Sequence, residues 1–154
     1  MTNQEVTLVP MEQSDLAILQ SWFKDAELRK RLGGMLPLQQ YFDFVQSEPN
    51  YFAWKAMEGD APIGVVFVQV EPSEPQSFGF LVKPTLRSRG YGRLILQKLM
   101  ALPEVASVKE WKAGIESDNI ASQRCLASVG FVPESSVEDE QGFLQYICNK
   151  SRSF

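Results

Sequence analysis

A short basic stretch with two glycines separates a predicted buried strand from a predicted amphipathic helix. The strand is predicted over residues 76–82 and the helix over residues 89–101. Gly90 and Gly92 permit backbone conformations that other residues avoid, and they let a ligand approach the main chain. The helix directs its first free N–H groups into this turn, where the helix dipole also favours an anion. The segment therefore predicts a site for a phosphorylated ligand.

Three arginines and the residues after the glycines narrow the class of phosphate ligand. Arg87, Arg89 and Arg93 bring full positive charges, which bond strongly to phosphate oxygens. A P-loop is excluded because no Gly-Lys-Ser or Gly-Lys-Thr closes the turn. The dinucleotide fingerprint is excluded because no third glycine follows Gly92 at the required spacing. The turn therefore predicts a cradle for a pyrophosphate, formed by the amides of residues 88–93.

The lack of histidine limits the chemistry that this chain can perform. None of the 154 residues is a histidine, which excludes histidine triads, histidine general bases and most catalytic zinc designs. We therefore expect no metal ion. The net charge of −4 argues against a nucleic-acid partner. The two cysteines, Cys125 and Cys148, are expected to be reduced structural thiols.

Composition predicts an ordinary soluble protein with one domain over residues 1–154. Its shares of 44% hydrophobic and 22% charged residues are typical of a globular fold with a substantial core. No run of about 18 apolar residues occurs, so we expect no membrane span. The first residues lack the basic and apolar regions of a signal peptide, and we therefore expect a cytoplasmic location.

Apolar periodicity predicts a mixed α/β sheet. The predicted strands are residues 5–10, 51–57, 63–70, 76–82, 108–115, 131–137 and 143–148. The predicted helices run from Ser14 to the Gly33-Gly34 pair, from Pro37 onward, and over residues 89–101 and 119–129. The fourth strand connects to the fifth through the helix after the glycine turn, which predicts a parallel pair. An edge strand near residues 143–148 would allow pairing across a homodimer.

The glycine turn resembles a known coenzyme motif. Arg87-x-x-Gly90-x-Gly92, preceded by Val82-x-Pro84, is similar to the acetyl-CoA signature of the GNAT superfamily of N-acetyltransferases. A six-residue glycine pattern is a weak signal by itself. The resemblance therefore depends on whether further blocks occur at the spacing that this family requires.

A second block and the start of the chain strengthen the resemblance. Asn119 lies 27 residues after Gly92 and opens a predicted helix that ends in Gly130-Phe131, which resembles the later GNAT motif. The interval accommodates one helix, a loop and one strand. The first strand and the following helix, which carries Trp22, are similar to GNAT branches that acetylate ribosomal-protein N-termini or aminoglycosides.

The resemblance implies a fold, a reaction and two substrates. It implies one GNAT domain of about seven strands and four helices, in which the fourth and fifth strands splay apart and acetyl-CoA sits in the gap. The implied enzyme transfers the acetyl group of acetyl-CoA to a primary amine by direct attack in a ternary complex. The expected partners are acetyl-CoA and a small-molecule or peptide amine, and no membrane is expected to take part.

The resemblance also implies which residues contact acetyl-CoA. The pantetheine arm is expected to contact backbone groups of the splayed strand on one wall and Asn119 on the other. The cradle is expected to hold the pyrophosphate. The implied coenzyme-binding residues are Leu81, Val82, Arg87, Ser88, Arg89, Gly90, Tyr91, Gly92, Arg93 and Asn119. Asn119 can at the same time cap the helix that it opens.

Acetyl transfer to an amine requires a proton acceptor. A lysine amine with a pKa of about 10.4 is neutral in only about one molecule in 2,500 at pH 7. Since histidine is absent, the base is expected to be a carboxylate or a water chain that leads to one. Glu116, which follows the fifth predicted strand, is the first candidate, and Glu71 and Glu74 are the second. The alternative for each is an exposed loop carboxylate.

The proton donor departs from the commonest GNAT pattern. Many members carry a tyrosine seven residues after the motif asparagine, where this chain has Leu126. Ser122, on the first turn of the same helix, is the candidate donor to the coenzyme sulfur. Its alternative role is a hydroxyl that only supports the start of the helix.

Two other functions remain open at this stage. A non-catalytic acyl-CoA sensor or interaction module on the same fold would keep the cradle but lack turnover, and Leu126 favours it modestly. A nucleotide-phosphate binder of another family is disfavoured by the missing P-loop lysine. Covalent catalysis by Cys125 is disfavoured because no activating partner is evident, so a buried thiol is expected instead.

Overall fold

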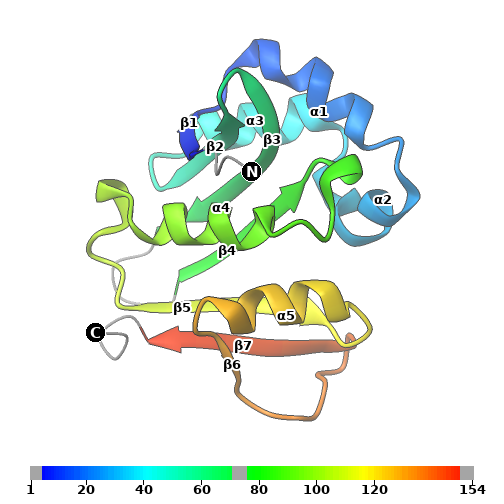
Figure 1. Cartoon of the computed structure of the whole chain (residues 1–154), viewed down its shortest axis with the longest axis vertical. Helices are drawn as coiled ribbons and strands as arrows, with labels where there is room; N and C mark the ends of the chain where they lie inside the picture. Colours follow the sequence, from blue (N-terminus) through cyan, green and yellow to red (C-terminus); the bar gives the residue numbers. More distant parts are fainter. Residues whose placement is uncertain (1–4, 71–75, 150–154) are drawn as a thin grey trace.

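The computed structural model describes residues 5–70 and 76–149, and it contains a seven-stranded mixed sheet with helices on both faces (Figure 1). The strands are β1 (Val6–Pro10), β2 (Tyr51–Glu58), β3 (Ala61–Gln69), β4 (Gln76–Val82), β5 (Glu110–Glu116), β6 (Val132–Pro133) and β7 (Phe143–Asn149). The helices are α1 (Leu16–Trp22), α2 (Ala26–Leu32), α3 (Leu38–Ser47), α4 (Tyr91–Met100) and α5 (Ile120–Ser128). The strand order is β1-β2-β3-β4-β5-β7-β6.

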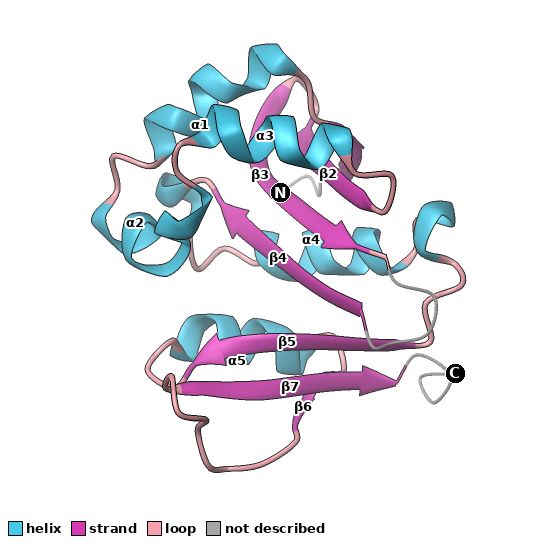
Figure 2. Cartoon of the chain, turned by 180° about the vertical axis from the view of Figure 1, so that it is seen from behind, coloured by secondary structure: helices cyan, strands magenta, loops and turns pink. Residues whose placement is uncertain are grey.

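The two middle strands of the sheet separate after a short contact. β4 and β5 are parallel and pair at only two positions, Gln76 with Trp111 and Ser77 with Lys112. Beyond these positions β4 and β5 no longer pair with each other, so their carboxyl ends flank an open V (Figure 2). The predicted parallel connection through the helix after the glycine turn and the expected splay are both confirmed. The glycine turn and Glu116 consequently lie at the same, open end of the V.

Two hydrophobic cores fix the helices on opposite faces. α4 and α5 pack on one face, over a core that includes the fully buried Trp111, Leu126 and Phe131. α1, α2 and α3 cover the other face of the β1–β4 half, where their apolar side chains meet Val65 and Leu81. The near face of β5 and β7 in Figure 2 carries no helix among the described residues.

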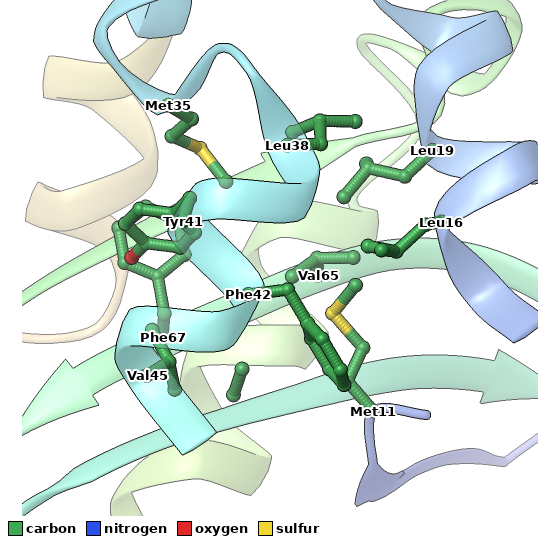
Figure 3. A pocket seen from close by; sticks show the side chains of 11 residues that line it. Met11, Leu16, Leu19, Met35, Leu38, Tyr41, Phe42, Val45, Val65 and Phe67 are labelled. Carbon is green, nitrogen blue, oxygen red and sulfur yellow. The ribbon is translucent and has the colours of Figure 1, made fainter. Parts of the chain in front are cut away.

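The space between α1, α3 and the sheet is filled by apolar side chains. Figure 3 shows Met11, Leu38 and Tyr41 converging there with residues of both helices. The void that they leave measures about 10 Å³, which holds one water molecule at most. This region is therefore a packed core and offers no room for a substrate.

One predicted helix is two helices in the structure. The sequence pattern predicts a continuous helix from Ser14 to Gly33, whereas α1 ends at Trp22 and α2 begins at Ala26. Asp25 causes the restart because its side chain accepts a hydrogen bond from the Leu28 amide at 2.9 Å, which is the geometry of a helix N-cap. The structure therefore has five α-helices among the described residues, one more than predicted.

The end of the chain also differs from the prediction. The strand predicted over residues 131–137 forms only at Val132–Pro133, after which the Glu134 amide adds one more hydrogen bond to the carbonyl of Gln145 at 2.8 Å. β7 pairs with β5 on one side and with β6 on the other, so it is an interior strand. The prediction that it is an edge strand is wrong, because β6 pairs with it at Tyr146 and Ile147.

Among the described residues, no helix is both long enough and apolar enough to cross a membrane.

Candidate active site

The main-chain groups of β4 face alternately toward β3 and toward the V. Lys83 donates its amide to the carbonyl of Ile63 at 2.8 Å. Since hydrogen-bonded positions alternate along an antiparallel pair, Leu81 also faces β3, whereas Phe80 and Val82 direct their N–H and C=O groups into the V. The main chain of Val82 thus faces the V, on the side where the sequence predicts a ligand. For Leu81 the register offers no such contact, and Phe80 takes its place.

The turn before α4 has the backbone geometry of an anion site. Ser88 has a φ of +63° and Gly90 a φ of +87°, so two residues of the turn lie in the left-handed region. Turns of this kind direct successive N–H groups into one concavity. A Cβ on Gly90 would meet no atom within 4 Å, which means that its φ and not crowding requires glycine. We call residues 80–93 the β4 lip of the V.

Gly92 is closely packed on the side where other residues carry a Cβ. A Cβ at this position would lie 2.9 Å from Sγ of Cys125 and 3.3 Å from Cε2 of Phe80. Gly92 therefore lets α4 pack closely against α5 and β4. The absence of a Cβ at the second glycine of the motif therefore serves helix packing.

The three arginines of the β4 lip differ in their partners. Arg87 forms an ion pair with Oδ2 of Asp25 at 2.5 Å, and this contact lowers the pKa of Asp25. Arg89 and Arg93 are exposed, and neither forms an ion pair within the described part of the chain. The lip therefore presents two cations that have no carboxylate partner in the described part of the chain, beside the amides of the turn.

Tyr91 contributes its amide to the turn but directs its side chain elsewhere. The hydroxyl donates to Oε1 of Glu58, at the end of β2, at 2.8 Å, and this hydrogen bond raises the pKa of Tyr91. The ring packs against the core under α4. The side chain of Tyr91 is therefore held by Glu58 and by the core.

Asn119 and Ser122 stand on the other side of the V, at the start of α5. Asn119 caps the helix, because its Oδ1 accepts a hydrogen bond from the Ser122 amide at 3.3 Å. The side-chain NH₂ of Asn119 has no partner within residues 5–70 and 76–149, so it is available to a ligand. The Ser122 hydroxyl is likewise without a hydrogen bond there, in contrast with Ser128, whose hydroxyl donates to the Cys125 carbonyl at 2.6 Å.

Glu116 ends β5 at the open end of the V. Its main-chain carbonyl accepts hydrogen bonds from the Asn119 amide at 2.9 Å and from Nε2 of Gln123 at 3.2 Å. Its carboxylate is partly exposed, and Oε2 lies 3.2 Å from Nη1 of Arg31. We call residues 116–122 the β5 lip. The other candidate bases, Glu71 and Glu74, lie outside the described residues.

Arg31 joins this lip to α2, and sequence reasoning missed it. Its guanidinium contacts Glu27 at 2.8 Å, Asp118 at 2.7 Å and Glu116 at 3.2 Å. Burial alone would lower the pKa of Arg31, but the three carboxylates outweigh it and raise the pKa. A basic last turn of α2 was visible in the sequence, yet nothing in the sequence indicated that its partners come from residues 116–118.

Leu126 and Cys125 both belong to the core. Leu126, at the position that carries a tyrosine in many GNAT members, is fully buried in the core. A leucine side chain has no proton to donate. Burial raises the pKa of the Cys125 thiol to about 11, which keeps it neutral near pH 7. The expectation of a structural thiol agrees with this environment. Among the described residues, no cluster of three metal-ligating side chains occurs.

The comparisons with known proteins agree with this geometry. Residues 5–132 match the acetyltransferase (GNAT) domain family. The chain belongs to the GNAT family. It is 39% identical over 137 residues to an uncharacterized N-acetyltransferase, YfmK, of Bacillus subtilis (strain 168), with 89% of this chain and 92% of that protein covered.

Solved structures of acetyltransferases have the same fold. The aminoglycoside acetyltransferase AAC(6')-Ib, in complex with paromomycin and acetyl-CoA, superposes with a TM-score of 0.81 at 20% identity, covering 96% of this chain and 94% of that one. Spermidine N-acetyltransferase from Vibrio cholerae, in complex with CoA and spermine, gives a TM-score of 0.82 at 13% identity, covering 97% and 98%. The predicted fold class is thereby confirmed.

Proposed function

We propose that this protein is a cytoplasmic N-acetyltransferase that binds acetyl-CoA and a primary amine together and transfers the acetyl group by direct attack. The observation that carries the proposal is the β4 lip, where two left-handed residues and two arginines without an ion pair among the described residues meet at the open end of the splayed strands. Family membership and a relative named as an N-acetyltransferase support the same reaction.

The coenzyme is proposed to lie along the V. The amides of residues 88–93, with Arg89 and Arg93, would bind the pyrophosphate. The pantetheine arm would pair with the main chain of Phe80 and Val82 on one side and with the free NH₂ of Asn119 on the other. An N–H of the splayed β4 strand would stabilise the oxyanion that develops on the thioester carbonyl.

The chemistry requires one proton acceptor and one proton donor. The amine nitrogen attacks the thioester carbon, the C–N bond forms, and the C–S bond breaks as the coenzyme thiolate leaves. Glu116 is proposed to accept the proton of the amine, because it is the carboxylate at the end of β5 on the open side of the V. Ser122, whose hydroxyl is unpaired among the described residues, is proposed to donate a proton to the sulfur.

The acceptor is proposed to be a cationic amine. Two structural neighbours were solved with an aminoglycoside or with spermine, both of them polyamines. The net charge of −4 favours a positively charged acceptor. The alternative, a non-catalytic acyl-CoA-binding module, is favoured by one observation, the burial of Leu126 where a tyrosine donor is common. It predicts coenzyme binding with no turnover of any amine.

Calorimetric titration tests the coenzyme site. Acetyl-CoA, CoA and ATP are titrated into the wild type, Arg89→Glu and Lys109→Glu. Both variants make the same charge change on an exposed residue, but Lys109 lies before β5, at the closed end of the V. We expect Arg89→Glu to weaken acetyl-CoA binding about tenfold or more, since a carboxylate would face the pyrophosphate, and Lys109→Glu to change it less than about threefold.

The same titrations can contradict the proposal. Equal weakening by both variants would mean that only overall charge matters, and tighter binding of ATP than of CoA would favour a nucleotide site. If acetyl-CoA binds as expected, an assay of CoA release with spermidine, an aminoglycoside and a peptide α-amine separates the enzyme from the non-catalytic alternative.

A further inference from the structure

Arg31 is a cation with an unusual setting in this structure. Its side chain is only 13% exposed, and three carboxylates surround it. Glu27 lies one helical turn earlier on α2, whereas Asp118 is 87 residues away in the sequence and belongs to the β5 lip. The guanidinium is therefore held from two sides, by its own helix and by the opposite segment. Such bidirectional pairing restricts the guanidinium to one position.

The third carboxylate, Glu116, is held differently in its main chain and its side chain. Its carbonyl is fixed by the Asn119 amide and by Gln123, which also donates to the Ser117 carbonyl at 3.0 Å. The carboxylate itself has one contact among the described residues, from Arg31 to Oε2. Oε1 is left free. Removing Arg31 would therefore release the side chain of Glu116 while its backbone stays in place.

We propose that Arg31 is a positioning residue for the acetyl-transfer reaction, which holds Oε2 of Glu116 so that Oε1 faces the acceptor amine. The proposal rests on the proposed function, in which Glu116 accepts the proton of the amine. A glutamate at the end of a strand has several rotamers, and a base must lie within hydrogen-bond reach of the proton that it takes. Fixing one carboxylate oxygen removes this rotamer freedom, and a misplaced base would lower the rate of acetyl transfer.

The chain offers a matched control on the same helix. Arg29 is also in the last turn of α2, but its guanidinium donates to the carbonyls of Phe23 and Lys24 at 2.9 and 2.6 Å and contacts no carboxylate among the described residues. Arg29→Gln removes the same charge from the same turn without touching the β5 lip. Comparison with Arg31→Gln thus separates loss of charge from loss of the contact with Glu116.

The experiment measures kcat, the KM for the amine and the acetyl-CoA affinity in the full-length protein. The variants are Arg31→Gln, Arg31→Lys, Arg29→Gln, Glu116→Gln and the double variant of positions 31 and 116. Arg31→Gln is expected to lower kcat about tenfold or more, with the acetyl-CoA affinity changed less than about twofold. Arg31→Lys should recover part of the loss, and Arg29→Gln should change kcat less than about threefold. In the Glu116→Gln background, Arg31→Gln should lower kcat by less than about twofold, because the residue that it positions is absent.

Several outcomes would overturn the proposal. Unchanged or higher kcat in Arg31→Gln would show that the contact is dispensable or inhibitory. A full tenfold loss of kcat in both backgrounds would show that Arg31 acts on the structure and not through Glu116. Thermal unfolding of each variant would reveal such a loss of stability directly. These results would overturn the role of Arg31 but not the proposed function, since the wild type would still acetylate an amine. A wild type that binds no acetyl-CoA or acetylates no amine would overturn the proposed function itself.

Discussion

The two lips of the V are built in different ways. The β4 lip is one continuous segment, residues 80–93, in which strand, turn and helix start follow one another directly. The β5 lip depends on α2, whose Arg31 reaches Asp118 across 87 residues of sequence. A continuous segment carries its geometry in its local sequence, whereas an assembled site depends on how the sheet brings distant segments together. The proposed coenzyme site is therefore encoded in one local stretch of sequence, whereas the proposed acceptor side is not.

The largest expected effect tests whether position 126 of α5 could hold the tyrosine that many GNAT members carry there. Leu126→Tyr would place a ring and a hydroxyl in a site that is fully buried. Overpacking and an unpartnered hydroxyl should together lower the free energy of unfolding by about 3 kcal/mol or more, without raising kcat. Urea unfolding and the CoA-release assay measure the two quantities. Leu126→Met is the control, with an expected loss below about 1.5 kcal/mol. A stable and faster Leu126→Tyr enzyme would show that this core adapts to a tyrosine.

A smaller effect tests the packing role of the second glycine in the β4 lip. Gly92→Ala should lower the free energy of unfolding by about 1 kcal/mol, because the contact with Sγ of Cys125 outweighs the gain in helix propensity. In a Cys125→Ala background the sulfur is gone, so the same substitution should cost less. Urea unfolding of the four proteins measures the coupling. Equal costs in both backgrounds would mean that Cys125 is not the obstacle and that the glycine serves another purpose.

Much of the fold followed from local patterns in the sequence. β4 was predicted with its observed bounds, because alternating apolar residues and Pro84 mark it, and α4 and α5 were predicted within two residues of theirs. The errors have local causes of their own. Asp25 interrupts a helical pattern that apolar spacing alone continues, and β6 stops at Pro133. Both residues were visible in the sequence, but whether they end a helix or a strand depends on tertiary packing.

The site was predictable to the extent that it is local. The turn from Arg87 to Gly92 could be located from charge and glycine spacing, although the close packing of Gly92 against Cys125 and Phe80 could not. Arg31 could not be found, since a basic residue in the last turn of a helix is expected from the helix dipole alone. Its partners become neighbours only when the sheet places the end of β5 beside α2.

The smallest expected effect concerns the contact that links α2 to the β4 lip. Oδ2 of Asp25 accepts from both the Leu28 amide and Arg87, and the Arg87 hydrogen bond is the main cause of the lowered pKa of Asp25. A carboxylate with a lowered folded-state pKa stabilises the fold above its unfolded pKa of about 3.8, and this contribution is lost as the pH falls through the folded value. Between about pH 5 and pH 2 the wild type should therefore lose more stability than Asp25→Asn, by roughly 0.5–1 kcal/mol, since asparagine keeps the cap but carries no titratable charge.

Urea unfolding at pH 6, 4 and 2.5 measures this difference, and Asp60→Asn in the β2–β3 turn, where no ion pair occurs among the described residues, is the control. Parallel pH curves for the wild type and Asp25→Asn would show that the ion pair adds nothing to stability. In that case the ion pairs of α2 with the V that matter for stability would be those of Lys30 and Arg31 with the β5 lip, and the two lips would be energetically independent. A difference of the expected sign would instead mean that one helix is linked by charge to both lips.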